Sequence, residues 1–292
     1  MLSSEEMDQF NAFINDISPQ HPQLASSLNQ SIKQSFSVSV FKKECPKVIQ
    51  PKSTNFLDFD PIEIARQLTL IDQDLLLSIC PTDLIPRNSS TIRSKPVMSY
   101  VTHFNKIASS IATLVLLLPT LSERVSYLKH IIRVLQECIE INNFGSSMAL
   151  MAAISSAPIY RLKNTWTKFN SKHTKSQVLH QQQKDLLSPN SSYGKLREQA
   201  SKDDTPQIPY LGMIMSDITI FTDLIPTFLS TGAWNFDKME KVVSVIKDFM
   251  RVRKWRYNFS EVPIIKNFIL GMTEMNTDQQ YARSLVIEPR AS

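Results

Sequence analysis

The amino-acid sequence predicts an all-α fold. Apolar residues recur at three- and four-residue spacing through most of the 292-residue chain, as they do on the buried face of a helix. Alternating apolar and polar residues, the pattern of a strand, are scarce, and there are only 5 glycines. Because 42% of the residues are hydrophobic, the chain can bury one large core or two smaller ones. We therefore expect a folded domain built from packed helices.

The first 50 residues differ from those that follow. One short amphipathic helix is possible there, with an apolar residue on each turn: Met7, Phe10, Ile14 and Ile17. Prolines and a stretch rich in Ser and Gln then indicate a connector. We interpret residues 1–50 as an N-terminal extension and residues 51–292 as the domain.

A long helix is expected to begin at Pro61. Asp60 suits the N-cap position, Pro61 the first helical position, and Glu63 the third, from which a carboxylate can reach back to the cap. Apolar residues then follow at helical spacing as far as Pro81: Ile64, Leu68, Ile71, Leu75, Leu76 and Ile79.

Further core helices are expected in the middle of the chain. The apolar run Ile107–Leu121 is shorter than the ~20 residues of a membrane span, so we expect a buried helix that ends at Pro119. The next helix carries an apolar stripe that ends near Asn142 and Asn143: Val125, Leu128, Ile132, Leu135 and Ile139. Another helix is expected after Gly145. Turns are expected at six places: Pro81, Pro119, 142–145, Pro158, Pro189 and Pro263.

Residues 208–256 predict an antiparallel helical hairpin. In its first helix, residues 208–225, apolar residues mark a buried face: Leu211, Ile214, Met215, Ile218, Phe221 and Ile225. A second row on this helix is short and polar: Ser216, Thr219 and Asp223. A bend containing Pro and Gly follows, and Asn235 is a suitable N-cap for a second helix over 235–253. That helix has its own apolar stripe: Phe236, Met239, Val243, Ile246 and Met250.

Charge and cysteine content argue against several classes of protein. The net charge is +5 and the pI about 9.0, but basic residues are mixed with acidic ones and form no run with aromatics, which disfavours nucleic-acid binding. The three cysteines lack the spacing of a disulfide framework or a zinc site. The N-terminus lacks the pattern of a signal peptide. These features favour a cytoplasmic protein.

The sequence contains no catalytic motif that we can identify. There is no Gly-rich phosphate loop, no HExxH and no GxSxG, and the 5 histidines are dispersed. We expect a binding protein that performs no covalent chemistry and uses no metal or cofactor.

Six short blocks give the chain a family resemblance that extends from about Asn55 to the C-terminus. They are Phe59–Leu70 (FDPIEIARQLTL), Phe104–Asn105, Glu140–Phe144 (EINNF), Ala157–Trp166 (APIYRLKNTW), Ile208–Gly212 (IPYLG) and Leu285–Arg290 (LVIEPR). In their order and spacing these blocks resemble the catalytic domain of Ras-family guanine-nucleotide exchange factors.

The resemblance implies an all-helical bowl that holds the switch regions of a small GTPase, with the hairpin projecting from it as a wedge. In the family the first hairpin helix displaces switch I and presents residues to the magnesium and phosphate sites. Those positions correspond here to Thr219 and Asp223, on the same polar row as Ser216. The implied activity is GDP release, because a partner that prefers the nucleotide-free GTPase weakens nucleotide binding by the same factor.

The resemblance also implies which residues contact the GTPase. Ser155 and Tyr160 flank a turn at the rim of the bowl, and Tyr193 and Arg197 correspond to residues near switch II. Tyr210, just before the hairpin, belongs to the same expected surface.

Arg66 is a sixth candidate for GTPase contact, and some candidates have structural alternatives. For Arg66, and for Arg161, the alternative is an ion pair with an acid such as Glu63 or Glu140. For Tyr193 the alternative is a half-buried aromatic that packs on the preceding helix.

Several positions depart from the family pattern. Thr219 stands where well-known members have leucine, although threonine also occurs there, and Asp223 replaces glutamate. Leu224 and Ile225 replace the acidic and glycine residues that close the first hairpin helix. Two alternatives to an active exchange factor therefore stay open: a catalytically weak or dead scaffold that binds a GTPase, and a helical adaptor without a GTPase partner.

The GTPase is expected to be of the Ras or Rap type, with the Ral type possible, because different blocks resemble different branches. The separate helical domain that usually braces the hairpin has no counterpart in residues 1–50, so we hypothesise that the helix at 7–17 acts as a reduced brace. We expect a cytoplasmic protein that its GTPase can recruit to a membrane, without stable membrane insertion of its own.

Overall fold

A computed structural model describes residues 45–85, 93–201 and 205–290, together with residues 39–40 and a few isolated positions before them. The short helix expected at 7–17 lies mostly outside the described residues.

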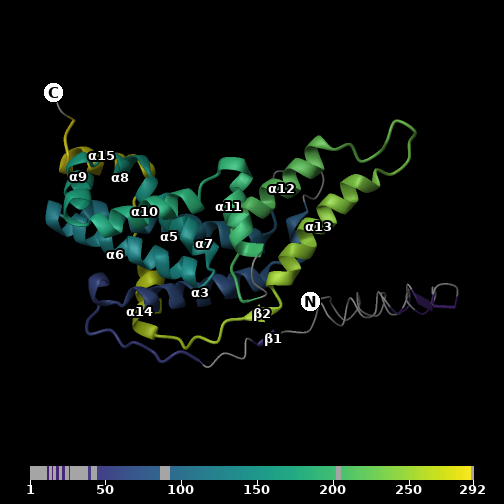
Figure 1. Ribbon diagram of the computed structural model, residues 1–292, viewed down its shortest axis with the longest axis horizontal. Helices are drawn as coiled ribbons and strands as arrows, with labels where there is room; N and C mark the ends of the chain where they lie inside the picture. Colours follow the sequence, from purple (N-terminus) through teal and green to yellow (C-terminus); the bar gives the residue numbers. More distant parts are fainter. Residues whose placement is uncertain are drawn as a thin grey trace.

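Helices dominate the described part of the chain (Figure 1). They are α3 (Pro61–Ser78), α4 (Pro81–Leu84), α5 (Lys95–Leu117), α6 (Leu121–Glu140), α7 (Phe144–Ser155), α8 (Ala157–Tyr160), α9 (Lys163–Lys172), α10 (Thr174–Leu186), α11 (Asn190–Ser201), α12 (Leu211–Leu224), α13 (Phe236–Val252), α14 (Pro263–Gly271) and α15 (Thr277–Ile287). Besides these there are a 3₁₀ helix, η1 (Phe56–Asp58), and two short strands, β1 (Ser39–Val40) and β2 (Trp255–Arg256), which pair in parallel. The expected all-α fold is confirmed.

The helices form a body from which α12 and α13 project as an antiparallel pair (Figure 1). Helix α7 lies in the middle of the body, in contact with α3, α5 and α6. It is buried on nearly every face, because most of its residues are small or apolar: Phe144, Gly145, Ser146, Ser147, Ala149, Leu150, Met151, Ala153 and Ile154.

The expected core helices are present. The apolar run 107–121 lies mainly in α5, where the side chains of Ile107, Ile111 and Val115 are at most 4% exposed, and α5 ends before Pro119. In the part of the chain that the structure describes, no helix is both long enough and apolar enough to cross a membrane.

The contacts at the start of α3 agree only in part with those predicted from the sequence. The Asp60 side chain accepts a hydrogen bond from Ile62 N at 3.1 Å, as an N-cap does. Glu63 does not reach back to the cap, so that expectation was wrong. Its buried carboxylate instead accepts from Ile49 N, from Arg66 Nη1 and from a glutamine one turn on, and so fixes the segment before α3 against the helix.

The helix expected after Gly145 begins earlier, at Phe144. Asn143 is its N-cap, and its side-chain oxygen accepts from Ser146 N at 2.9 Å. A Cβ atom on Gly145 would lie 2.4 Å from the Tyr100 hydroxyl. Gly145 therefore marks a close approach between α7 and α5, and does not precede the helix.

A buried polar cluster joins α3 to the start of α7. Asn143 Nδ2 donates to Thr69 Oγ1 and to Asp72 Oδ2, each at 2.9 Å, and Ser146 Oγ donates to the same carboxylate. His103 Nε2, from α5, lies 3.3 Å from Asp72 Oδ1. Asp72 is 4% exposed, so it depends on the hydrogen bonds from Asn143 and Ser146 to replace water.

The start of the hairpin is fixed to the same turn. Ile208 N donates to Asn142 O at 3.0 Å, and Phe144 N donates to Ile208 O at 2.9 Å. Asn142 adopts a left-handed conformation with φ of 59°, which asparagine tolerates better than most residues. The chain therefore enters α12 from a point anchored to the core.

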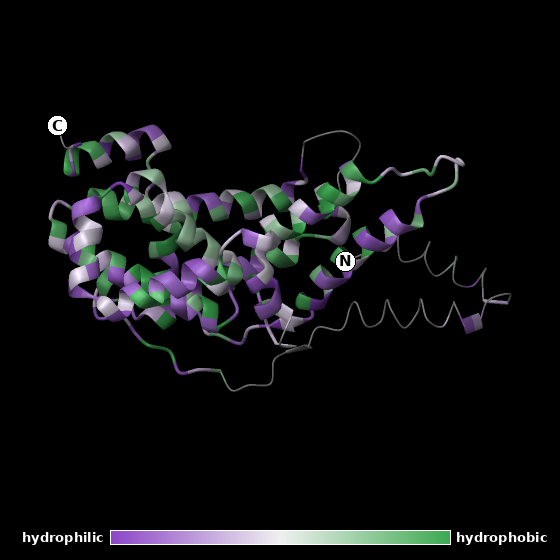
Figure 2. Ribbon diagram, turned by 45° about the horizontal axis from the view of Figure 1, so that its top comes forward, coloured by the Kyte–Doolittle hydropathy of each residue, from purple (hydrophilic) through white to green (hydrophobic). Residues whose placement is uncertain are grey.

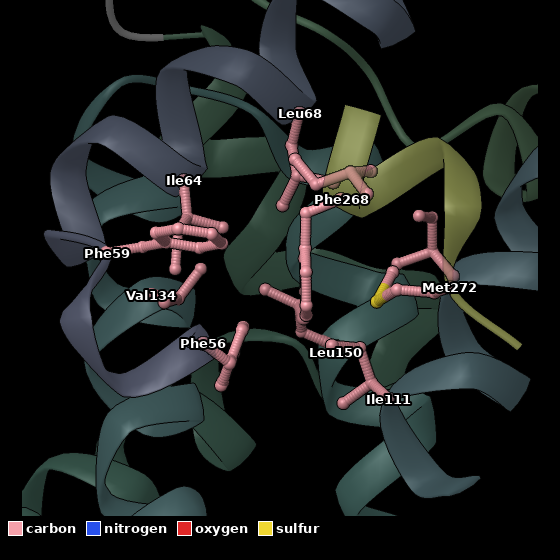
Figure 3. A pocket seen from close by; sticks show the side chains of 11 residues that line it. Phe56, Phe59, Ile64, Leu68, Ile111, Val134, Leu150, Phe268 and Met272 are labelled. Carbon is pink, nitrogen blue, oxygen red and sulfur yellow. The ribbon is translucent and has the colours of Figure 1, made fainter. Parts of the chain in front are cut away.

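Figure 3 shows the seam where η1, α3 and α14 meet. The ring of Phe268 lies edge-on to Phe59 at 5.1 Å and stacks on Phe56 at 5.9 Å, with Ile64 and Leu68 beside them. The space that these side chains leave is about 10 Å³ and is lined by apolar atoms. It is a dry core contact, because a water molecule there would have no polar partners.

We predict that Asn143→Ala destabilises the fold strongly. The change removes the α7 cap and two buried hydrogen bonds, one of them to a buried carboxylate, so the free energy of unfolding should fall by about 2–4 kcal/mol. Urea denaturation followed by circular dichroism measures this change.

The matched control is Asn276→Ala. Asn276 caps α15 through a bond from Gln279 N at 2.9 Å but is exposed, so its loss should cost only about 1 kcal/mol. Equal losses in the two variants would show that Asn143 acts as an ordinary cap and that the buried cluster contributes nothing further.

Candidate functional site

The bend between α12 and α13 is closed by local contacts. Asn235 Oδ1 accepts from Lys238 N at 3.4 Å, which confirms it as the N-cap of α13, and its Nδ2 donates to Pro226 O at 3.0 Å. The rings of Phe228 and Trp234 lie 4.6 Å apart across the bend. The expected helical hairpin is therefore present, within 211–252.

The base of the hairpin is packed into the body. On α12, Leu211, Ile214 and Ile218 are at most 7% exposed, and Phe249 of α13 is 1% exposed. These residues form a second hydrophobic cluster with residues from α3, α4 and α5: Leu76, Ile79, Leu84, Val97 and Tyr100. The inner half of the hairpin is thus part of the core.

The outer half of the hairpin is not packed in this way, and Figure 2 shows hydrophobic segments (green) along it. The stripe expected to be buried on α13 is largely exposed: Phe236 by 74%, Val243 by 46% and Met239 by 37%. The expectation of a fully packed side was wrong: among the described residues, α13 packs mainly on α12 and α4. The fully buried residues of α13 lie near its C-terminal end, at Phe249 and Val252.

The polar row expected on α12 lies mostly in the open. Ser216 and Asp223 are exposed, and Thr219 is half-buried because its Oγ1 accepts a hydrogen bond from Arg93 Nη2 at 3.1 Å. Nη1 of the same guanidinium is buried and has no hydrogen-bond partner.

Two apolar residues on the open face of α12 were not among the expected site residues, although Leu224 was noted as a departure from the family pattern. Ile220 is 45% exposed and Leu224 is 76% exposed. They follow Ser216 at intervals of four residues, so helical spacing could have found them. The uncovered face of α12 therefore combines hydroxyl, carboxylate and aliphatic groups.

The residues expected near switch II lie at the foot of the hairpin. Arg197 Nη2 forms an ion pair at 2.8 Å with Asp217 of α12, and its Nε donates to Ser192 O at 2.8 Å. Arg197 thus connects α11 to the hairpin directly. Its side chain keeps 38% exposure, which leaves it accessible from outside.

Tyr193 and Tyr210 pack on each other. Their ring centroids are 5.6 Å apart in an edge-to-face arrangement, and Phe104 of α5 lies 5.8 Å beyond Tyr210. Burial, and then the neighbouring Tyr193, raise the pKa of Tyr210, so its hydroxyl stays protonated at neutral pH. Tyr193 is half-buried, in agreement with its structural alternative, but its packing partner is Tyr210.

Ser155 and Tyr160 lie at the other end of the body. Both are exposed, Tyr160 by 60%, and they line a groove beside α8. In Figure 1, α8, α10, α11 and α12 follow one another along one side of the molecule. The expected contact residues are therefore spread along that side and do not meet in one cluster.

Arg66 does not belong to that side. Its Nη1 donates to Glu63 at 3.0 Å and to Lys47 O at 3.3 Å, so the structural alternative accounts for its contacts. The corresponding expectation for Arg161 was wrong: within the described part of the chain it pairs with no acid and instead donates to the backbone and hydroxyl oxygens of Ser284.

The chemical inventory of the described residues is small. No group of three or more His, Cys, Asp or Glu side chains among them could hold a metal ion. Cys45, Cys80 and Cys138 are free thiols, and burial raises the pKa of Cys138 well above its ordinary value. What the described surface offers is shape and polarity for binding.

Comparison with known proteins gives this arrangement a family. The model of the RasGEF domain matches residues 63–240, more than half of the chain, from α3 into α13. The chain belongs to the RasGEF domain family. The resemblance drawn from the six sequence blocks is thereby confirmed.

Named relatives agree with this assignment. Ras guanine nucleotide exchange factor P of Dictyostelium discoideum is 30% identical over 98% of the chain, and Ras guanine nucleotide exchange factor I of the same organism is 29% identical over 91%. Ras-specific guanine nucleotide-releasing factor 2 of Rattus norvegicus is 26% identical over 94%. The matches span only 20%, 33% and 24% of these three relatives, respectively.

We predict that breaking the Arg197–Asp217 pair loosens the hairpin without unfolding the body. A partly exposed pair of this kind contributes about 1 kcal/mol, so Asp217→Asn should speed hydrogen exchange of the α12 amides about fivefold. The reversed double variant Arg197→Asp, Asp217→Arg should restore slow exchange. Hydrogen–deuterium exchange with mass spectrometry resolves these peptides.

Lys195→Ala is the matched control for this experiment. It removes the exposed Lys195–Asp185 pair, which involves the same helix α11 but does not touch α12. Exchange of α12 should then stay at the wild-type rate. A failure of the reversed pair to restore protection would assign the effect of Asp217→Asn to something other than the ion pair.

Proposed function

We propose that the chain is a guanine-nucleotide exchange factor that binds a Ras-superfamily GTPase and promotes GDP release without covalent chemistry. The observation that carries the proposal is the RasGEF match over 63–240, which includes the projecting hairpin with its uncovered α12 face. The names of the relatives, all Ras exchange or releasing factors, support the same activity.

In this proposal α12 enters the GTPase beside switch I. Thr219 and Asp223 approach the magnesium and phosphate sites, with Ser216 on the same row and Ile220 and Leu224 against the displaced loop. Loss of Mg²⁺ removes the main charge that neutralises the phosphates, and the Asp223 carboxylate makes the vacated site less favourable for them. Switch loops suit this displacement because the nucleotide and its metal ion are what order them.

The proposed mechanism is tighter binding to the nucleotide-free GTPase than to the nucleotide-loaded GTPase. If the chain binds the nucleotide-free GTPase about a thousandfold more tightly than the loaded form, linkage weakens nucleotide binding by the same factor, or about 4 kcal/mol. The contact surface that we propose continues from α12 through Tyr210, Tyr193 and Arg197 to Ser155 and Tyr160. We leave Arg66 outside it, because its contacts with Glu63 and Lys47 support a structural role.

We predict that Thr219→Ala, Asp223→Ala lowers GDP release by about ten- to hundredfold, because the two polar groups proposed to approach the magnesium and phosphate sites are lost. The measurement is release of a fluorescent GDP analogue from Ras, Rap, Ral and Rho proteins, with a Ras- or Rap-type substrate favoured and a Ral type possible. Ser244→Ala, Asp248→Ala is the matched control, since both residues are exposed on α13. The proposal is wrong if no GTPase in the panel both binds the chain in nucleotide-free form and releases GDP faster in its presence.

A scaffold without exchange activity is the second candidate. The observation that favours it is the hydrogen bond from Arg93 to Thr219, which occupies the hydroxyl that the wedge would present. Such a protein would bind a nucleotide-free GTPase yet leave GDP release at its basal rate. The same panel separates the two candidates, and Arg93→Ala would raise release only if this hydrogen bond restrains the wedge.

We propose that the helix expected at 7–17 braces the hairpin. The support is the pairing of β1 with β2, which brings the chain at Ser39 alongside Trp255, three residues after α13 ends. Deleting residues 1–38 should lower exchange several-fold while the melting temperature of the body hardly changes, because the contacts of residues 45–50 with α3 are retained. Exchange at the wild-type rate in the shortened chain would contradict a bracing role.

A further inference from the structure

A groove of about 810 Å³ runs between the end of α7 and helices α8, α9 and α10. Two residues expected to contact the GTPase, Ser155 and Tyr160, line it. Its volume is that of a site for several side chains or a small ligand.

The floor and one wall of the groove are aromatic. The ring of Trp166 stacks on His180 with centroids 5.4 Å apart, and its Nε1 donates to Ile159 O at 3.0 Å, which holds the indole in place. Tyr160 forms the wall, with Lys163 Nζ 4.2 Å from its ring centroid. Val178, 54% exposed, adds an aliphatic patch. An occupant can therefore bury apolar atoms against fixed rings.

The charge of the groove has one sign. Lys163 and Lys184 line it, and none of the residues that line it is an Asp or Glu. The sequence itself contains no acidic residue between Glu140 and Asp185, and Asp185 is paired with Lys195. The groove therefore presents a positive potential, because no acidic lining residue offsets the charges of the two lysines.

His180 adds polarity without adding charge. Burial, and then the nearby Lys184, lower its pKa to about 4, so the ring is neutral at physiological pH. Its Nδ1 is buried and has no hydrogen-bond partner. The groove therefore combines two cations with one neutral imidazole ring.

We propose that the groove seats an acidic segment of the GTPase and that Lys163 and Lys184 help to select which GTPase binds. The inference rests on the proposed function, because it names the partner of the same surface. The argument for it is charge complementarity. A carboxylate on the partner would be attracted by both lysines, whereas a basic segment would be repelled. The aromatic floor favours a peptide segment over a lipid headgroup, which would leave Trp166 and Tyr160 without an apolar partner.

The test uses the full chain with Lys163→Glu, Lys184→Glu, and with the milder Lys163→Gln, Lys184→Gln in case the reversal perturbs folding. The probe is the GTPase that responds in the release panel, in nucleotide-free form. Its association rate is measured at several salt concentrations. We expect the reversal to slow association at least about tenfold at low salt and to remove its salt dependence, and the neutral variant to fall between.

The matched control is Lys168→Glu, Lys175→Glu. These two lysines are exposed on α9 and α10 but do not line the groove, and the variant has the same net charge as the reversal. At about 0.15 M salt its association rate should stay within about threefold of the wild type, since the Debye length is then only about 8 Å and charges outside the contact are screened. Equal slowing in both reversed variants would overturn the proposal, because only the overall charge would then matter.

The remaining outcomes separate the inference from the function on which it rests. If the groove variants leave association unchanged while Thr219→Ala, Asp223→Ala abolishes release, the groove assignment is overturned and the exchange activity stands. If Lys163→Glu, Lys184→Glu loses only binding to vesicles of phosphatidylcholine and phosphatidylserine, the occupant is a lipid surface and the proposal is again overturned. If no GTPase binds in nucleotide-free form, both are overturned.

Discussion

The arrangement of the whole domain depends on the buried carboxylate of Asp72. It accepts hydrogen bonds from Asn143 and Ser146, and it can do so only if α3 and the start of α7 keep their present distance. Asn142, next in the chain to Asn143, pairs through its backbone with Ile208. One buried charge therefore sets the position of α7, the most enclosed helix, and of the point at which α12 begins. If α3 and α7 packed differently, the Asp72 carboxylate would be buried without hydrogen-bond donors. The free-energy cost of that is large enough to make such packings rare.

This anchoring explains how a hairpin can both be held and remain open to a partner. Its inner half shares a hydrophobic cluster with α3, α4 and α5, and Arg253 Nη2 donates to Leu77 O at 2.8 Å near the end of α13. Its outer half exposes the apolar side chains of Leu224 and Phe236. A packed base suits the wedge role that we propose for the hairpin, because little binding energy would then be lost in ordering it.

Much of the fold could be predicted because its signals are local. The cap at Asp60, the cap at Asn235 and the stripe that runs through α6 each depend on residues within a few positions, and all three are confirmed. Glu63 could not be predicted in the same way, since its partner Ile49 lies outside the helix. Arg161 is a stronger case, because it donates to Ser284, more than a hundred positions away.

The candidate site was predictable only where it follows one helix. Ser216, Thr219 and Asp223 share a row that spacing reveals, but the bond from Arg93 to Thr219 arises from tertiary packing. Periodicity also identified the apolar stripe of α13 without showing that Phe236 and Val243 in its outer part are exposed. The groove illustrates the same limit. The sequence does not show that Lys163 and Lys184 line one groove, because this depends on how α9 and α10 pack together.

The three tryptophans of the chain have an optical consequence. Trp234 lies in the hairpin bend, Trp166 in the groove floor, and Trp255 in β2 at the foot of the hairpin. Indole emission depends on local polarity, so the hairpin bend, the groove and the foot of the hairpin each carry a native fluorophore. Variants that keep one tryptophan at a time would report separately when each region is covered, and in what order, without an attached dye.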